Sequence, residues 1–509
     1  VIHQETRRDA LGRVIAQTEG EVRLVVGSGR LGIAYLIERD GFLFHSPIAW
    51  YRREGRWDLP PGYEKSNPHF DRPIQSVCLF CHANRSEPVE GTVNRYQPPF
   101  FAGHAVGCER CHGPGELHAA RPNLIDGRDL TIVNPAALEP ALRDAVCQQC
   151  HLNGQKRVLR AGRRDEDYRP GLPFQHFWTV LERPGSLEEN RLVGQFEQMH
   201  QSRCFQASQG RLGCITCHDP HQLPEPDENL AYFRDRCLEC HSDRGCSLPA
   251  TVRTEQGRAD DCVRCHMPRM NNSDIIHVAE TNHRIPRRAD ETKRTGTKAG
   301  NSNGNLRPWV NFHRDLMTER ERDEAERDVG VALCLDGPIG AATALPALED
   351  ALAAWPDDVP GWEAKGYALG LLHRDQEGLS AFRKALALEP NRESALTGAA
   401  FSAAHAGRRD DSIAYWQRAI GLSPWRAEYR AELASLYFQS REWHAATSAC
   451  REALRLDPAN LDVRKLLVRS LLRLGDNSAA QGEFETLIAF DPPDRDRLLG
   501  WFTTLTKSR

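Results

Sequence analysis

The sequence has few methionines, no long apolar run and no long basic block, and each absence narrows the range of functions. No apolar run approaches the ~18–20 residues that a membrane-spanning helix requires, so we expect no transmembrane segment. The formal net charge is −4 and the basic residues do not gather in one block, which excludes nucleic acid as an expected partner. The chain also begins at Val1 without the basic and apolar leader of a secretory signal.

Cysteine, by contrast, is abundant, and twelve of the 16 cysteines stand in six copies of a Cys-x-x-Cys-His pattern. This pattern is the attachment signature of c-type haem, in which two thiols bond to the porphyrin and the adjacent histidine ligates the iron. Structural zinc also uses Cys-x-x-Cys pairs, but it has no need of a histidine directly after the second cysteine. We therefore predict six c-type haems. The cysteines are Cys78, Cys81, Cys108, Cys111, Cys147, Cys150, Cys214, Cys217, Cys237, Cys240, Cys262 and Cys265, and the proximal histidines are His82, His112, His151, His218, His241 and His266.

Haem is attached to this motif outside the cytoplasm, so we expect an exported protein that is periplasmic, extracellular or at the cell surface. The missing leader is then explained by a signal peptide that has been removed or left out. In an oxidising compartment Cys204 and Cys246, which lie inside the haem region, are candidates for a disulfide, although sequence does not show whether their geometry allows it. Cys334 and Cys450 lie in helical repeats and are expected to be buried.

The first two thirds of the chain divide by composition into three parts. Residues 1–66 contain alternating apolar runs between glycine-rich turns, at 21–26, 32–38 and 41–46, which predict a small antiparallel sheet. Residues 67–285 carry all six motifs and little helical periodicity, so we expect a domain with little regular structure whose core is supplied by the macrocycles. Its motifs begin 30, 39, 67, 23 and 25 residues apart, which predicts closely spaced haems. Residues 286–322 are expected to form a linker.

Residues 323–509 show a 34-residue period that predicts tetratricopeptide repeats. Small residues recur 12 positions before each repeated proline, and bulky or apolar residues recur eight positions before it. Small residues let two helices touch, the bulky residue fills the groove between them, and proline ends the second helix. We predict five repeats and a capping helix at Arg495–Lys507. The expected fold is therefore mixed, with a small β region, a haem-packed domain and an all-α repeat solenoid. The repeated prolines are Pro356, Pro390, Pro424, Pro458 and Pro492.

Each predicted haem iron needs a second axial ligand to be saturated, and histidine is the expected one because the chain has only four methionines. Fourteen of the 20 histidines remain after the six proximal ones are assigned. The leading distal candidates lie just before or after a motif: His69, His104, His118, His221, His277 and His283. His176 and His200 rank below them, and His3, His45 and His313 rank lower still.

Two strings resemble known multihaem families. The segment 107–115, Gly-Cys-Glu-Arg-Cys-His-Gly-Pro-Gly, followed by His118, resembles the tetrahaem cytochrome c family of ammonia oxidisers. The segment 262–268, Cys-Val-Arg-Cys-His-Met-Pro, with a later Thr-x-His, resembles the last haem site of pentahaem nitrite reductases. Both belong to a superfamily that includes hydroxylamine oxidoreductase and octahaem tetrathionate reductase. Most of the chain resembles bacterial proteins that join this module to tetratricopeptide repeats. The resemblance implies haems packed in parallel and perpendicular pairs.

The sequence departs from these families in two respects. It lacks the Cys-x-x-Cys-Lys motif that holds the catalytic haem of nitrite reductases. It also lacks a further haem motif ahead of the sheet region, so an N-terminal segment that carries one is an open alternative.

Three functions are compatible with these features. The first is electron transfer through six haems, with the repeats docked to a redox protein, a membrane complex or other copies of the chain. The second is a multihaem oxidoreductase that acts on a small nitrogen or sulfur compound at an open iron, for which no catalytic residue is identified. The third is a subunit of an extracellular cytochrome polymer. An electron carrier is the favoured hypothesis because histidine is abundant enough to saturate every iron.

Overall fold

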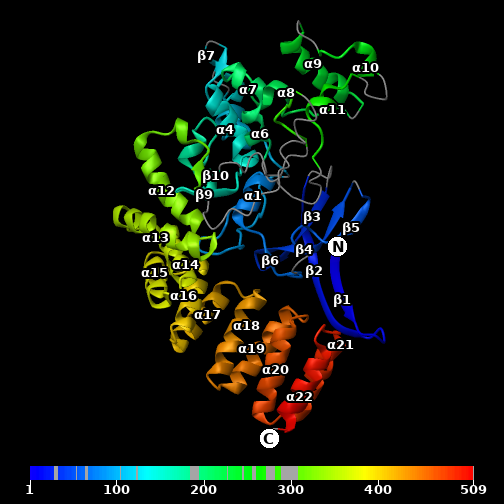
Figure 1. Cartoon of the computed structure of the whole chain (residues 1–509), viewed down its shortest axis with the longest axis vertical. Coiled ribbons are helices and arrows are strands. Elements are labelled where there is room, and N and C mark those ends of the chain that lie inside the picture. Colours follow the sequence, from blue (N-terminus) through cyan, green and yellow to red (C-terminus); the bar gives the residue numbers. More distant parts are fainter. Residues whose placement is uncertain are drawn as a thin grey trace. The chain divides into compact units, whose positions relative to one another are not determined.

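The computed structural model describes most of the chain (Figure 1). The chain divides into two compact units. Unit 1 comprises Val1–His104 and Leu333–Arg509, and unit 2 comprises Ala105–Ala332. A small β region near the N-terminus and a helical solenoid at the C-terminus confirm the predicted mixed fold. The described residues are 1–27, 32–52, 54–63, 67–103, 105–121, 124–125, 127–183, 194–225, 227–242, 246–254, 260–270, 281–287 and 308–507.

The β region of unit 1 is an antiparallel sheet in the order β1-β2-β3-β4-β5, with β6 paired to β4. Apolar side chains of β3 and β4, including Leu36, Leu43 and Phe44, alternate onto a buried face because successive strand residues point to opposite sides. The three predicted strands fall within β2, β3 and β4, whereas β1 was missed because its sequence is mostly polar. The strands are β1 (Ile2–Arg8), β2 (Val14–Val26), β3 (Gly32–Arg39), β4 (Phe42–Tyr51), β5 (Arg56–Asp58) and β6 (Arg72–Pro73).

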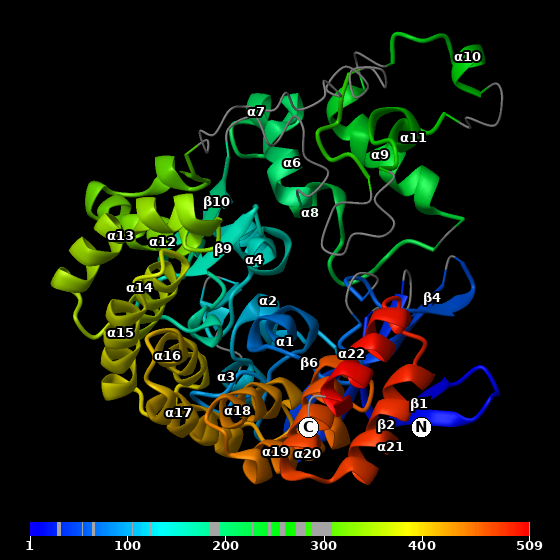
Figure 2. The same ribbon diagram turned by 60° about the horizontal axis from the view of Figure 1, so that its bottom comes forward.

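The C-terminal part of unit 1 is a stack of helix pairs with the predicted period, and Figure 2 shows its helices side by side in a curved row. The bulky residues eight positions before each proline are buried, with Phe382 and Trp416 each 1% exposed and Cys450 0% exposed. The predicted capping helix is α22. The helices of this stack are α13 (Gly337–Ala354), α14 (Val359–Leu371), α15 (Asp375–Leu388), α16 (Glu393–His405), α17 (Arg409–Leu422), α18 (Ala427–Gln439), α19 (Trp443–Leu456), α20 (Leu461–Leu474), α21 (Asn477–Ala489) and α22 (Arg495–Lys507). Helix α12 (Glu319–Leu333), whose residues from 323 on were predicted to belong to the repeats, lies in unit 2 except for Leu333.

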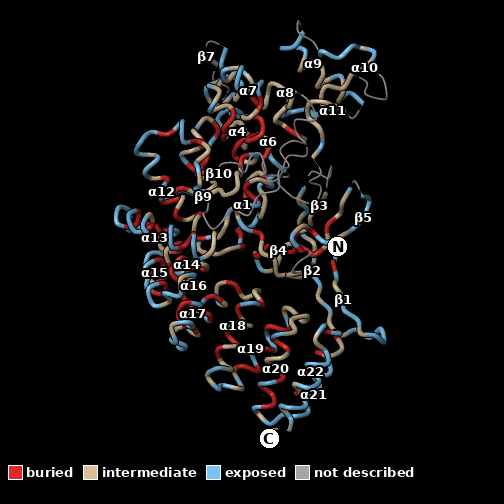
Figure 3. Tube along the Cα trace, viewed as in Figure 1, coloured by how far each residue is buried: buried red, intermediate tan, exposed pale blue. Residues whose placement is uncertain are grey.

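The first haem motif belongs to unit 1, whereas the sequence grouped it with the other five. Its helix α1 (Ser76–His82) buries Leu79 against the sheet residues Leu36 and Leu43. Figure 3 colours the buried residues of the chain red. The adjoining loop also binds the repeats, because the Glu393 backbone N–H donates to the Gly91 carbonyl over 2.7 Å. Residues 67–103 therefore fold with the sheet and the repeats.

Unit 2 contains short helices around a three-stranded sheet, ordered β11-β10-β9. The strands are β9 (Lys156–Leu159), β10 (Trp178–Glu182) and β11 (Val310–Asn311). Strand β11 lies in the stretch predicted as a linker, so residues 308–322 pack within unit 2 instead of bridging freely. Met317 and His313 in this stretch are buried, with 4% and 3% of each residue exposed. Within the part of the chain that the structure describes, no helix is both long and apolar enough to cross a bilayer.

Candidate haem-attachment sites

All six Cys-x-x-Cys motifs lie on or at the start of short helices. Residues three apart lie on the same face of a helix, so the two cysteines of each motif point to the same side and can both bond one porphyrin. The histidine follows at the last helical position or directly after it, one turn from the first cysteine. The helices are α1, α2 (Glu109–His112), α4 (Pro140–His151), α8 (Cys214–Cys217), α9 (Asn229–His241) and α11 (Cys262–His266).

The thiols of successive motifs in unit 2 are electrostatic neighbours in the order in which the motifs occur in the chain. Cys111 of the second motif lies near Cys147 of the third, whose thiol is hydrogen-bonded to Cys214 of the fourth. The pKa of the Cys217 thiol is raised chiefly by burial and further by charges that include Cys240 of the fifth motif. Cys237 of the fifth motif is in turn hydrogen-bonded to Cys262 of the sixth. The attachment points therefore form one continuous series through unit 2.

Several histidines are oriented as iron ligands require. The Nδ1 of His112 donates to the Val133 carbonyl over 2.7 Å, and the Nδ1 of His266 donates to the Pro286 carbonyl over 3.0 Å. A carbonyl oxygen can only accept, so each Nδ1 carries the proton and each Nε2 keeps its lone pair for a metal. The proximal histidines of the second and sixth motifs therefore fit a haem iron.

Two proximal histidines each lie near a second histidine, at a centroid separation that suits a shared iron. The ring centroids of His112 and His221 are 5.9 Å apart with an interplanar angle of 16°, and those of His218 and His283 are 6.4 Å apart at 25°. A metal–imidazole bond is about 2 Å long, so two rings on opposite sides of one iron have centroids about 6 Å apart. These pairs bring together two predicted distal ligands, His221 and His283, with predicted proximal ligands.

Helix α6 (Gln195–Gln201) lies among the histidines of the third and fourth motifs. Gln195 hydrogen-bonds His151, and the Gln198 side-chain oxygen accepts from the His283 backbone N–H over 2.8 Å. Burial lowers the pKa of His151, His218 and His283, which favours the neutral imidazole that binds iron. Sequence reasoning missed these glutamines, although their spacing of three residues places them on one helix face.

The remaining distal candidates have mixed surroundings. His118 directs Nδ1 at the Asp129 carboxylate over 2.6 Å, which leaves Nε2 for a metal. Both ring nitrogens of His69 face carboxylates, with Nδ1 2.8 Å from Glu5 and Nε2 3.9 Å from Asp457. The Glu5 hydrogen bond raises the pKa of His69, an arrangement that suits a protonated imidazole better than an iron ligand.

Two further distal candidates, His104 and His277, lie outside the described residues. The lower-ranked histidines of unit 2 have other neighbours. His176 pairs with Glu321 over 2.9 Å, His200 stacks on Phe205 with centroids 4.0 Å apart, and His313 lies 3.1 Å from Gln148.

The candidate disulfide between Cys204 and Cys246 is not formed, and no disulfide occurs among the described cysteines. The two thiols have different neighbours: Cys204 lies near Cys240, and Cys246 lies near Cys262. Each therefore approaches a different haem motif.

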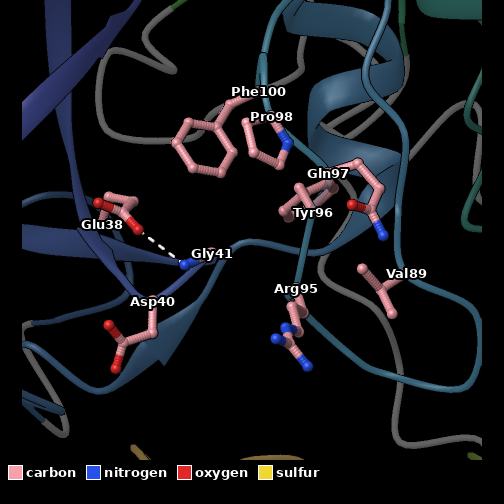
Figure 4. Close-up of a pocket in the computed structure, with 9 residues that line it drawn as sticks. All are labelled: Glu38, Asp40, Gly41, Val89, Arg95, Tyr96, Gln97, Pro98 and Phe100. Atoms are coloured by element: carbon pink, nitrogen blue, oxygen red, sulfur yellow. Dashed lines mark hydrogen bonds between the residues drawn. The ribbon is translucent and has the colours of Figure 1, made fainter.

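A cavity of about 390 Å³ in unit 1 lies apart from the motifs (Figure 4). Its wall includes Glu38, whose carboxylate accepts from the Gly41 backbone N–H over 2.7 Å, together with Arg95 and Phe100. No residue of a Cys-x-x-Cys-His motif lines it. Among the described side chains, no group of three or more histidine, cysteine, aspartate or glutamate residues is arranged to hold a metal ion.

Comparison with known families matches two separate parts of the chain. Residues 62–113, which span the first two motifs, match the model of the family described as cytochrome c554 and c-prime. Residues 437–499 match a tetratricopeptide repeat model. The chain thus combines a cytochrome c554-like segment with tetratricopeptide repeats, which indicates a c-type cytochrome.

Solved structures that resemble the chain include MamA proteins. The MamA fragment 41-end from Desulfovibrio magneticus RS-1 is 19% identical, with a TM-score of 0.32 over 33% of this chain and 95% of that one. Another MamA crystal structure is 15% identical, with a TM-score of 0.32 over 34% of this chain and 95% of that one. No curated protein matches the chain.

Proposed function

We propose that this protein is an exported multihaem c-type cytochrome that transfers electrons through six covalently bound haems. The observation that carries the proposal is the series of neighbouring thiols that links the second to the sixth motif, through the pairs Cys111–Cys147, Cys147–Cys214, Cys217–Cys240 and Cys237–Cys262. When bound, haem supplies a one-electron iron centre whose potential depends on its axial ligands and surroundings. The protein would hold the haems next to one another in the order in which the motifs occur in the chain.

The facing histidines support electron transfer over catalysis. An iron with two imidazole ligands has no open position for a substrate, and the His112–His221 and His218–His283 pairs have the spacing for such ligation. Burial keeps His218 and His283 in the neutral, ligating form. We therefore assign these irons to electron transfer.

The repeats supply the second part of the proposal, a docking or assembly surface. Repeat stacks present extended surfaces to protein partners because each unit contacts only its neighbours in the stack. In unit 1 the turn before α16 binds the 87–97 loop, since the buried Glu393 carboxylate accepts from Val93 N–H over 2.9 Å. This contact joins the repeats to the first haem motif, so we propose that they hold a redox partner or another copy of the chain.

The test is haem quantification and low-temperature EPR on one sample of the full chain, expressed with the haem attachment system of an exporting host. We expect six covalent haems per chain and only low-spin signals. Absence of covalent haem would refute the proposal. About one equivalent of a high-spin signal that shifts with nitrite would instead favour an oxidoreductase that acts on a small nitrogen compound.

A variant that lacks the cysteines of one motif checks the number of haems per chain. Replacing Cys237 and Cys240 together by alanine should lower the haem content by one and leave the other signals in place. Light scattering over a range of concentrations then separates docking to a different partner from self-assembly, because only self-assembly raises the mean mass with concentration.

A further inference from the structure

Tyr168 is a buried polar side chain of unit 2 that lies close to two haem motifs. It follows the short 3-10 turn Asp165–Asp167, and only 3% of it is exposed. Its ring packs edge-on against Phe177 at 5.5 Å between centroids, and against Trp178 at 5.3 Å. The turn is tied down because the Trp178 indole N–H donates to the Asp165 carboxylate over 2.7 Å. The direction of the phenol is therefore set by packing.

The Tyr168 hydroxyl is buried and has no hydrogen-bond partner among the residues that the structure describes. Buried hydroxyl groups are almost always hydrogen-bonded, because an unmet donor loses its bonds to water without replacement. Phenylalanine would fill the same aromatic niche without that cost. A tyrosine here thus implies an acceptor that the side chains around it do not provide.

Burial is the main cause that raises the pKa of Tyr168, and the nearby thiols of Cys147, Cys111 and Cys150 raise it further. These thiols belong to the second and third haem motifs. The two motifs are joined directly, since the Gln149 side-chain N–H donates to the Arg110 carbonyl over 2.9 Å. The hydroxyl therefore lies where the attachment points of two neighbouring haems meet.

We propose that Tyr168 donates a hydrogen bond to the haem held by Cys147 and Cys150, and that it is a positioning residue that raises the reduction potential of this haem. A donor aimed at a redox group stabilises its electron-rich, reduced form, and hydrogen bonding around a haem is one of the means by which a protein sets the potential. The inference rests on the proposed haem attachment. The hydrogen bond from Tyr168 would set the reduction potential of this haem apart from those of the other haems in the series.

The experiment is a spectroelectrochemical redox titration of the full haem-loaded chain and its Tyr168→Phe variant. We expect one component to become harder to reduce, with its reduction constant about tenfold lower, which corresponds to about 59 mV for a one-electron couple. The remaining components should not move. Tyr367→Phe is the matched control, because the Tyr367 hydroxyl donates to the Ser394 carbonyl within the repeats over 3.2 Å. Unchanged potentials in Tyr168→Phe would overturn the inference.

A second measurement on the unmodified protein does not depend on how well the variant folds. Redox-induced infrared difference spectra with ring-labelled tyrosine should contain a tyrosine C–O band that shifts on haem reduction. Absence of any such band would overturn the inference even if the variant loses haem. If the unmodified chain carries no haem at all, the proposed function fails first, so haem content separates the two failures.

Discussion

The imidazole rings of His112 and His221 have centroids 5.9 Å apart and planes only 16° from parallel, although the two residues are 109 positions apart in the sequence. The Nδ1 of His112 donates to the Val133 carbonyl, so its Nε2 keeps a lone pair for a metal. Two imidazoles bound to opposite sides of one iron would have centroids about 6 Å apart, which is close to the separation of this pair. This relationship leads directly to the first prediction.

Replacing His221 by alanine should open one iron. Because His112 would remain as the proximal ligand, we expect about one haem equivalent of low-spin EPR signal to become high-spin, with the haem content unchanged. His176→Ala is the control, since the His176 Nε2 pairs with the Glu321 carboxylate over 2.9 Å. An unaltered spectrum in His221→Ala would show that another group ligates this iron.

Replacing Trp416 by alanine should destabilise the repeats. Trp416 is 1% exposed and packs against Phe401 and Tyr429, with centroids 5.0 and 5.4 Å away. Removing a buried tryptophan leaves a cavity, so the free energy of unfolding should fall by about 3–5 kcal/mol, measured from helical circular dichroism in urea. The control Trp355→Ala removes a side chain that is 38% exposed and should change it by no more than about 0.5 kcal/mol.

Glu182 on β10 should make unit 2 less stable as pH rises. Burial, and then the charge of Glu197, raise the pKa of Glu182 to about 7 from its ordinary value of 4.5. Between these values the folded state binds more protons than the unfolded state, so the free energy of unfolding falls as pH rises through this window and stays lower above it. It follows that Glu182→Gln should flatten this pH dependence.

The measurement is thermal unfolding of the full chain at pH 5, 6, 7 and 8, and the matched control is Glu326→Gln on the exposed face of α12. Glu326→Gln should keep the slope of the unmodified protein. A Glu182→Gln variant that keeps the same slope would show that the buried carboxyl is not the group responsible.

Glu393 should hold the first haem segment to the repeats. Its carboxylate is fully buried and accepts from Val93 N–H over 2.9 Å and from the Tyr429 hydroxyl over 2.7 Å. Glu393→Ala leaves both donors without an acceptor, at about 1–3 kcal/mol each. We expect faster hydrogen exchange in the 87–97 loop. Tyr429→Phe removes one donor and keeps the Val93 bond, so it should protect the loop better than Glu393→Ala does.

Local and periodic features of the fold could be predicted from the sequence. The repeats were predictable because Phe382, Trp416 and Cys450 recur at a fixed interval and fill equivalent grooves between helices. The sheet was predictable where apolar residues alternate, but β1 has the polar sequence of an edge strand and gives no such signal. The grouping of residues 67–103 with the repeats depends on single backbone bonds such as Glu393 to Gly91, which leave no trace in composition.

In the candidate haem sites, too, the local features could be predicted from the sequence and the long-range contacts could not. Each Cys-x-x-Cys-His motif is a local pattern, and the structure places each on a helix whose turn brings its two cysteines together. Which distal histidine meets which proximal one is a property of long-range packing, so His283 could be named as a candidate but not paired with His218. His69 lies close to the first motif in sequence, yet its ring is held between Glu5 and Asp457. Sequence proximity to a motif is therefore a weak guide to ligation.

The first motif lies in the same compact unit as the repeats, and this has a consequence for electron transfer through the protein. Under the proposed function, a partner bound by the repeats is held by the same unit that bears Cys78, Cys81 and His82, so the first haem is the one that shares a unit with the partner's binding surface. The five later motifs lie in the other unit. Partner binding and the first haem would thus belong to one unit. Exchanging the repeats for another set would change the redox partner while the haem-binding motifs stayed the same.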